Sequence, residues 1–299
     1  MNVLLTSATG YIGSAVAAAL QASGHHVIGI ARSEASAQRL KALGIQAYRG
    51  DLTDAASLRQ AAQIADAVIH TAATNDANMA TLDRLAVEAI LAALDGTQKP
   101  FVYTSGIWVI GDTAGQIADE TTPLKPSPIV AWRPAVEQVV LAAAQRGVRS
   151  VVIRPALVYG QGGGLVAMLI QAGRDNGAVP VVGDGRNLWP LIHVEDLAKL
   201  YVKAMEQAPA GTMLIGASGE HLPLQEVALA AAQAAGLEDR LQFLTLDEAR
   251  QTWGLLADAL ALDQQVNSDR ARHLLNWVPE APSVLEELSK GSYRHAIAA

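Results

Sequence analysis

The chain has 299 residues, a formal net charge of −7 and no cysteine. The lack of cysteine excludes disulfides, thiolate catalysis and cysteine-based metal sites, and an acidic chain without a basic cluster is not expected to bind nucleic acid. A hydrophobic fraction of 51% with 17% charged residues excludes a disordered chain. No apolar run approaches the roughly 20 residues that span a bilayer. We therefore expect a soluble, cytoplasmic, globular protein that binds neither a metal nor a membrane.

The first half of the chain alternates short apolar runs with amphipathic stretches. The apolar runs predict strands near 2–6, 26–31, 45–49, 66–70, 99–104 and 150–154. The stretches between them predict helices near 11–22, 34–43, 54–62, 78–94 and 131–146. This alternation is typical of right-handed βαβ units, so we predict an α/β fold with a doubly wound parallel sheet. Beyond residue 155 the alternation of strands and helices is less regular, with glycine-rich loops and shorter elements, and a last helical region follows Pro282.

The turn between the first strand and the first helix has the glycine-spaced sequence TSATGYIG, residues 6–13. A short loop at a helix N-terminus exposes backbone N–H groups, and the helix dipole favours a pyrophosphate there. Gly10 lets the backbone approach the phosphate, and Gly13 lets the helix pack closely on the strand. The alternative is an ordinary strand-to-helix turn. We predict dinucleotide binding, with cofactor contacts from Ser7, Thr9, Gly10, Tyr11, Ile12 and Gly13.

The end of the second strand indicates which dinucleotide is preferred. An NAD-specific site places Asp or Glu about 20 residues after the glycines, on the ribose 2′-OH. Here Ala31 offers no carboxylate, and Arg32 and Ser33 follow it. An arginine can pair with a 2′-phosphate through charge-assisted hydrogen bonds, so NADP(H) is favoured over NAD(H). The alternative is a surface arginine at the start of the next helix.

Two further turns are expected to contact the cofactor. Asp51 and Leu52 follow the third predicted strand, where they can flank the adenine. The small residues after the fourth predicted strand leave room for the cofactor backbone; they are Thr71, Ala72 and Ala73.

Five segments of the chain together resemble a known family. TSATGYIG, GDLTD, VYTSG, VVIRPALVYG (151–160) and IHVEDLA (192–198) occur in the order found in extended short-chain dehydrogenases/reductases, the NAD-dependent epimerase/dehydratase group. The resemblance covers essentially the whole chain and implies a Rossmann domain over residues 1–160. A smaller C-terminal substrate portion over 161–299, which can return strands to the sheet, is implied as well. Ser7 departs from the pattern, because the family usually has glycine there.

The catalytic positions depart further from the family pattern. Its members usually pair a Ser or Thr with a Tyr and a Lys four residues apart, and the lysine lowers the pKa of the tyrosine for proton exchange. Aligning YTSGIWVIG puts Gly106 at the hydroxyl position, one residue after Ser105. Matching the family's helix on Glu137 puts Arg133 at the lysine and Ile129 at the tyrosine. The usual proton donor is therefore absent.

Other residues near the family's reaction centre are candidates for the site. The candidate catalytic residues are Ser105, Arg133 and Tyr159, although an arginine cannot shuttle a proton at ordinary pH. Arg133, Thr104 and Pro155 are the expected contacts to the nicotinamide side of the cofactor. The candidate substrate contacts are Trp108, Trp132, Tyr159, Trp189 and His193. Each of these aromatic residues also has a simpler interpretation as part of the core.

Three functional classes remain open from the sequence. The first is an NADP(H)-dependent oxidoreductase that acts on a small carbonyl, hydroxyl or sugar-like substrate. The second is an epimerase or dehydratase that retains its cofactor. The third is a non-catalytic protein that senses NADP(H), which the loss of the usual catalytic residues favours.

The chain is also a candidate homodimer. In the family, helices matching 78–94 and 131–146 often form a two-fold interface through a four-helix bundle. The alternative is that their apolar residues simply pack on the sheet. Those residues are Leu82, Leu85, Ile90, Val136, Val139, Val140 and Leu141.

Overall fold

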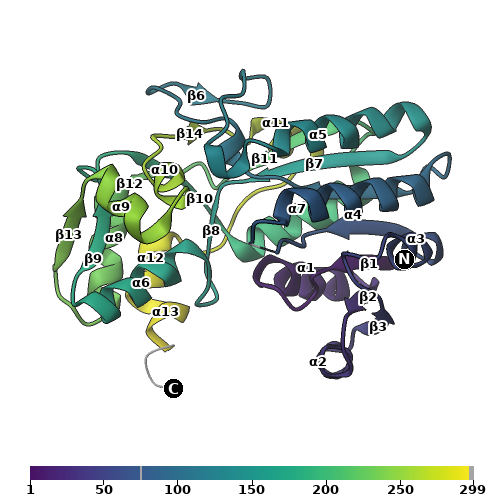
Figure 1. Ribbon diagram of the computed structural model, residues 1–299, viewed down its shortest axis with the longest axis horizontal. Helices are drawn as coiled ribbons and strands as arrows, with labels where there is room; N and C mark the ends of the chain where they lie inside the picture. Colours follow the sequence, from purple (N-terminus) through teal and green to yellow (C-terminus); the bar gives the residue numbers. More distant parts are fainter. Residues whose placement is uncertain (75, 296–299) are drawn as a thin grey trace.

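A parallel sheet forms the centre of the molecule. The computed structural model describes residues 1–74 and 76–295, and within them the main sheet has seven strands in the order β3-β2-β1-β4-β5-β7-β11, all parallel. The strands are β1 (Asn2–Thr6), β2 (His26–Ala31), β3 (Gln46–Arg49), β4 (Ala67–His70), β5 (Pro100–Thr104), β7 (Arg149–Pro155) and β11 (Thr212–Gly216). The chain passes from β1 toward one edge and from β4 toward the other, so the order reverses between β1 and β4 (Figure 1). The predicted doubly wound sheet is confirmed.

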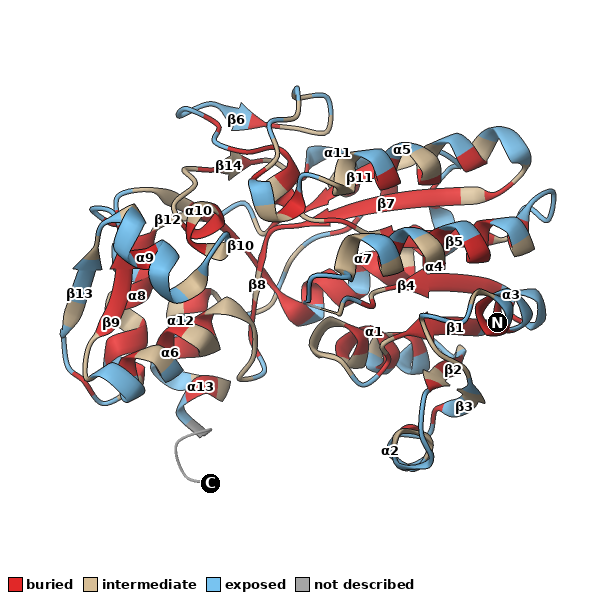
Figure 2. Ribbon diagram, in the orientation of Figure 1, coloured by how far each residue is buried: buried red, intermediate tan, exposed pale blue. Residues whose placement is uncertain are grey.

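Helices cover both faces of this sheet. Alternate residues of each strand point to opposite faces, so Val3 and Leu5 of β1 pack into one core and Leu4 into the other. The first face carries α1 (Tyr11–Ala22), α2 (Glu34–Ala42), α7 (Val194–Gln207) and α11 (Asp269–Leu275). The second carries α3 (Ala55–Ile64), α4 (Met79–Leu94) and α5 (Arg133–Ala142). The central strands are buried on both sides (Figure 2), which explains why they read as continuous apolar runs.

The rest of the chain forms small sheets and helices that lie beside the main sheet (Figure 1). Its small sheets are β12-β10-β8, β13-β9 and β14-β6. Their strands are β6 (Ile117–Ala118), β8 (Leu157–Tyr159), β9 (Val179–Val182), β10 (Leu188–His193), β12 (His221–Pro223), β13 (Leu241–Leu244) and β14 (Gln265–Val266). Its helices are α6 (Gly164–Asn176), α8 (Leu224–Ala234), α9 (Leu246–Trp253), α10 (Leu256–Leu260), α12 (Val284–Lys290) and α13 (Ser292–His295). From beyond residue 160, α7, β11 and α11 return to the main sheet.

One predicted helix is divided. The stretch predicted as a helix over 131–146 contains α5 from Arg133 to Ala142, and 3₁₀ turns lie before it (η2, Pro128–Val130) and after it (η3, Ala143–Arg146). The second turn ends at Gly147, whose φ of 74° is left-handed, a conformation that glycine adopts without steric cost. The other predicted helices and strands of the first half match the structure within about two residues.

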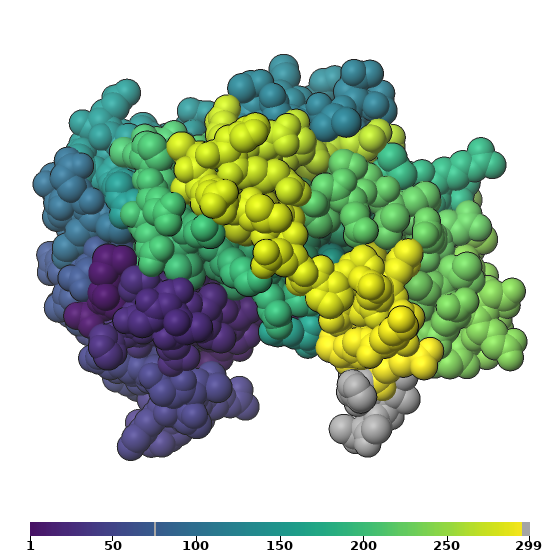
Figure 3. Space-filling view, turned by 180° about the vertical axis from the view of Figure 1, so that it is seen from behind, coloured from purple at the N-terminus to yellow at the C-terminus, as the bar shows by residue number. Residues whose placement is uncertain are grey.

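The C-terminal segment lies against the glycine-rich loop 160–164, which faces the start of α1. The Gly160 amide donates to the Tyr293 hydroxyl at 2.7 Å, and that hydroxyl donates to the Gly163 carbonyl at 2.7 Å. Figure 3 shows these last helices in yellow, with teal and green parts of the chain between them and the purple N-terminal helices. Among residues 1–74 and 76–295, none of the helices is long and apolar enough to span a membrane.

Candidate active site

The carboxyl ends of the strands form one edge of the main sheet, and the predicted cofactor residues lie along it. In open α/β sheets ligands bind outside these ends, at the point where the strand order reverses. Here that point lies between Thr6, which ends β1, and His70, which ends β4. The turn after β1 and the loop after β4 are held together, because the Thr71 hydroxyl donates to the Thr6 carbonyl at 2.7 Å.

The glycine turn has the tight shape that its sequence predicts. Ser7 adopts a left-handed φ of 56°, a conformation that favours glycine, the residue that the family resemblance leads us to expect at this position. A Cβ at Gly13 would stand 2.0 Å from the Ser7 carbonyl oxygen, so a side chain there would push the helix off the turn. Gly10 is the N-cap of α1 and offers no side-chain cap, whereas Ser33 caps α2 and Asp54 caps α3. This uncapped helix start fits a bound phosphate.

Charged residues gather at the ends of β2 and β3. Arg32 and Ser33 are exposed immediately after β2. The Asp51 Oδ1 accepts from the Thr53 amide at 2.9 Å and from the Thr53 hydroxyl at 2.8 Å. These hydrogen bonds, with a smaller contribution from the positive charge of Arg32, lower the pKa of the Asp51 carboxyl. Arg32 is therefore within electrostatic reach of the turn after β3.

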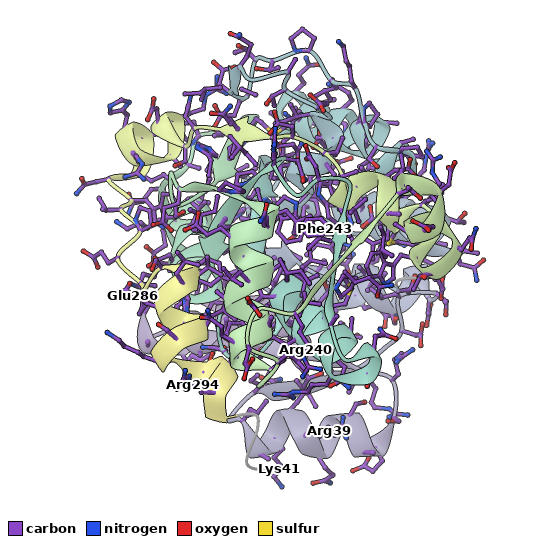
Figure 4. All side chains as sticks on the ribbon, turned by 90° about the vertical axis from the view of Figure 1, so that its left-hand side faces the viewer. Arg39, Lys41, Arg240, Phe243, Glu286 and Arg294 are labelled. Atoms are coloured by element: carbon purple, nitrogen blue, oxygen red, sulfur yellow. The ribbon has the colours of Figure 1, made fainter. Side chains whose placement is uncertain are left out.

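A second arginine at this end was missed by the sequence analysis. Arg49 is exposed at the end of β3 and stands opposite Ala31 in the strand register. The register of two parallel strands could have indicated it, because residues that end neighbouring strands share one edge of the sheet. Figure 4 shows Arg39 and Lys41 further along α2, the helix that follows Arg32.

The end of β5 brings two predicted residues together. The Arg133 Nη1 donates to the Thr104 carbonyl at 2.9 Å, and the guanidinium lies 4.7 Å from the ring centre of Trp132, a cation–π contact. Ser105 follows directly, is 7% exposed, and its Oγ has no hydrogen-bond partner among the described residues. A Cβ at Gly106 would meet nothing within 4 Å. The Ser105 hydroxyl is thus buried without a partner among the described residues, and the open space lies on the side of Gly106.

Tyr201 is a further residue that the sequence analysis missed. Its hydroxyl donates to the Thr104 Oγ1 at 2.7 Å, and the Thr104 hydroxyl in turn donates to the His70 carbonyl at 2.7 Å. Burial raises the pKa of Tyr201 far above its usual range, so it keeps its proton. Its place on the buried face of α7 was a usable signal, because a buried tyrosine hydroxyl needs a polar partner.

A buried ion pair holds α5, and with it Arg133, on the sheet. Glu137 of α5 and Arg154 of β7 form two parallel hydrogen bonds of 2.9 and 2.6 Å, and their side chains are 0% and 4% exposed. Glu137 is the residue that the sequence analysis matched to the glutamate of the family's helix. Arg133 stands four residues earlier, about one helical turn away on the same side of α5. The pair therefore fixes the height and rotation of Arg133 above β5.

Two predicted aromatic contacts are half-buried near this end of the sheet. Trp108 lies in a 3₁₀ turn after β5 (η1, Ile107–Val109), and its carbonyl accepts from the Ser127 amide at 3.0 Å. Trp132 lies between Arg133 and a surface groove along α4 and α5.

Three other predicted site residues are buried, and their polar atoms have protein partners. Tyr159 is 1% exposed and donates its hydroxyl to the Pro282 carbonyl at 2.8 Å. Trp189 is equally buried, and its Nε1 donates to the Leu260 carbonyl at 3.1 Å. His193 caps α7 through Nδ1, packs edge-to-face on Tyr159 at 5.3 Å, and lies 3.6 Å from Glu287. Their polar atoms have protein partners, so none presents a group to a substrate in this structure.

The predicted role of Tyr11 in cofactor binding also meets a competing contact. Its hydroxyl donates to the Gly160 carbonyl at 2.9 Å, and its ring packs where Cβ atoms of Gly163 and Gly164 would be. Burial is the largest of the effects that raise the pKa of this hydroxyl. Tyr11 thus links the start of α1 to the loop 160–164 and leaves only its backbone for a phosphate.

Fold and glycine turn together define a dinucleotide-binding α/β protein. Residues 3–216 match the NAD dependent epimerase/dehydratase family. The chain is 32% identical over 299 residues to an uncharacterized protein of Schizosaccharomyces pombe, covering 98% of this chain and 100% of that protein. It is 29% identical over 267 residues to the 2-alkyl-3-oxoalkanoate reductase of Stenotrophomonas maltophilia, covering 82% of this chain and 80% of that protein.

A solved structure with a similar fold is the UDP-glucose 4-epimerase of Thermus thermophilus in complex with NAD, with a TM-score of 0.81, 21% identity and coverage of 100% of both chains. The chain belongs to the NAD dependent epimerase/dehydratase family, as its motifs predict. It is accordingly an NAD(P)-dependent oxidoreductase or epimerase.

Proposed function

We propose that this protein is an NADP(H)-dependent oxidoreductase that acts on a small carbonyl, hydroxyl or sugar-like substrate. The observation that carries the proposal is the order of groups along one edge of the sheet. Arg32 stands at the end of β2, the uncapped start of α1 follows β1, and Arg133 with Ser105 stands at the end of β5. These positions match the three parts of an extended dinucleotide: the 2′-phosphate, the pyrophosphate and the nicotinamide ribose.

The turns around this edge supply the remaining cofactor contacts that we propose. The first turn of α1 faces the pyrophosphate with its backbone N–H groups. Asp51 and Leu52 flank the adenine, and Thr71, Ala72 and Ala73 leave room for the cofactor backbone. Thr104 and Pro155 end neighbouring strands on the nicotinamide side. The reductase named among the relatives supports carbonyl chemistry over nucleotide-sugar epimerisation, because it is more similar to this chain than the UDP-glucose 4-epimerases that also match.

The chain's own residues then have limited roles in the reaction. A bound NADP(H) supplies or accepts the hydride. Arg133 stays protonated at ordinary pH, so it orients a ribose or a substrate oxygen and does not transfer a proton. The Ser105 hydroxyl has no hydrogen-bond partner among the described residues, and we propose that it donates to a substrate oxygen. Because no tyrosine stands at the position of the family's tyrosine, water supplies the proton that the reduced carbonyl oxygen takes up.

The test is a turnover assay with a panel of small ketones, aldehydes and sugars. We expect a substrate-dependent loss of NADPH absorbance with at least one carbonyl compound. Tight NADPH binding without turnover of any compound would favour the NADP(H)-sensing alternative. Isomerised or dehydrated product formed without added cofactor would favour the epimerase or dehydratase that retains its cofactor.

The missing catalytic groups make a gain-of-function experiment possible. The backbone of Gly106 is extended and open space surrounds it, so Gly106→Ser fits without a clash. Ile129 is half-buried in the turn before α5, four residues from Arg133. We expect Gly106→Ser with Ile129→Tyr to raise carbonyl reduction at least about tenfold, part of the roughly 10²–10⁴ that a positioned general acid contributes. The control is Gly106→Ser alone; equal rates for the single and double variants would contradict the placement of the tyrosine position.

The predicted dimer remains a proposal, and fewer of its predicted interface residues are available at the surface. Ile90, Val136 and Val140 are buried in the core of one chain, as the alternative interpretation holds. The surface that stays available is the groove between α4 and α5, lined by Leu85, Ala92, Trp132 and Ala135 with charged residues around them. We expect light scattering to give a two-fold mass at micromolar concentration, and Ala135→Glu in the groove to return it to a monomer. A monomeric mass for the unchanged protein would refute the dimer.

A further inference from the structure

A buried polar chain lies beneath the carboxyl edge of the sheet, at the point where the strand order reverses. Asp83 of α4, His70 at the end of β4 and Thr6 at the end of β1 are 7%, 1% and 0% exposed. The His70 Nε2 lies 3.4 Å from the Asp83 Oδ1, and the His70 Nδ1 lies 3.0 Å from the Thr6 Oγ1. The proposed reaction does not use any of these three side chains.

The hydrogen bonds of Thr6 determine which atoms of this buried polar chain donate and which accept. Its Oγ1 accepts from the backbone amides of Thr71 at 3.1 Å and Ala72 at 3.2 Å. A hydroxyl has two acceptor sites and one proton, so the Thr6 proton is left for the His70 Nδ1. That nitrogen must therefore be unprotonated. The proton of a neutral His70 is then on Nε2, which lies 3.4 Å from the Asp83 Oδ1 without forming a hydrogen bond among the described residues.

Tyr103 holds the other end of the chain. Its hydroxyl donates to the Asp83 Oδ2 at 2.8 Å, and its ring stacks on the His70 ring at 6.1 Å with an angle of 9°. Burial raises the pKa of Tyr103 well above its usual range, so its hydroxyl keeps the proton that it donates. The carboxylate of Asp83 and the imidazole of His70 are thus both fixed in orientation.

This arrangement holds the loop 71–73 in a defined shape. Two successive amides of the loop bind one hydroxyl, and the Thr71 side chain returns a hydrogen bond to the Thr6 carbonyl. The Thr71 Oγ1 also lies 3.1 Å from where a Cβ of Gly13 would be, so the loop borders the glycine turn directly. We infer that Asp83, His70 and Thr6 are positioning residues for the dinucleotide: they hold the loop 71–73 against the glycine turn in its cofactor-binding shape. The inference rests on the proposed function.

The sharpest test compares Thr6→Val with Thr6→Ser. Valine has the shape of threonine but leaves the two amides without an acceptor, whereas serine keeps the hydroxyl. We expect Thr6→Val to weaken NADPH binding at least about tenfold, because small displacements of binding groups have effects of this size. Thr6→Ser should stay within about twofold of the unchanged protein. His70→Asn, whose side-chain oxygen replaces the Nδ1 acceptor, should bind NADPH more tightly than His70→Leu.

A second measurement separates local release of the loop from general unfolding. In the cofactor-free protein, hydrogen exchange of the Thr71 and Ala72 amides should accelerate in Thr6→Val, while the amides of Val68 and Ile69 in β4 stay protected. Equal NADPH affinity of Thr6→Val and Thr6→Ser would overturn the inference and leave the proposed function intact. Failure of the unchanged protein to bind either dinucleotide would overturn the proposed function, and the inference with it.

Discussion

Glu137→Ala is expected to lower the free energy of unfolding by about 3–5 kcal/mol, the usual effect of removing one partner of a buried ion pair. The substitution leaves the Arg154 guanidinium charged and buried with no counter-ion. Its Nη1 already has no hydrogen-bond partner among the described residues, so little else can compensate. Chemical denaturation followed by circular dichroism measures the change.

Two controls make this result specific. Glu137→Leu combined with Arg154→Met removes both charges and should lose much less stability than Glu137→Ala, because no unpaired charge remains in the core. Arg146→Ala removes an exposed ion pair with Asp95 and should change stability by roughly 0–1 kcal/mol. A loss for Glu137→Ala as small as that for Arg146→Ala would contradict the assignment of a buried pair.

Arg32→Ala is expected to weaken NADP(H) binding by about 1.5–3 kcal/mol, the value of one charged hydrogen bond, and to leave NAD(H) binding nearly unchanged. The reason is that only the 2′-phosphate carries the charge that Arg32 would meet, and Ala31 offers no carboxylate to a ribose 2′-OH. Isothermal titration calorimetry with both cofactors measures the difference.

Arg39→Ala is the matched control. Like Arg32→Ala it removes one positive charge, but Arg39 lies within α2, outside the turn after β2 (Figure 4). It should alter the affinities for both cofactors equally and slightly. Equal affinities for NADP(H) and NAD(H) in the unchanged protein and in Arg32→Ala would refute the phosphate role of Arg32. An intermediate loss would point to Arg49, which ends the neighbouring strand.

Local signals in the sequence were enough to predict six of the seven strands of the central sheet; β11 was not among the predicted strands. The strands β1, β2, β4, β5 and β7 are apolar runs that turns end, and the turn at Gly10 and Gly13 follows directly from the strand before it. These features depend on neighbours within about ten residues, so periodicity and turn chemistry reveal them. Arg133 was placed through the same kind of spacing, four residues before a glutamate that the structure shows to be buried.

Other predicted site residues have partners that the sequence does not reveal. Three aromatic side chains each donate a hydrogen bond to a backbone carbonyl at least 71 residues away; they are Tyr159, Trp189 and Tyr11. Nothing near them in the sequence indicates these partners, and an aromatic residue that follows a motif resembles a ligand contact until its partner is known. Tyr201 was overlooked for the same reason, because its partner Thr104 lies 97 residues earlier.

A crystal structure with bound NADP⁺ tests the central claim most directly. It should show the pyrophosphate over the turn from Gly10 to Gly13, the 2′-phosphate in contact with Arg32, and the nicotinamide beside Ser105 and Arg133. A nicotinamide that faces away from Ser105 and Arg133 would contradict the account of the reaction site, and a 2′-phosphate that lies away from Arg32 would contradict the choice of cofactor.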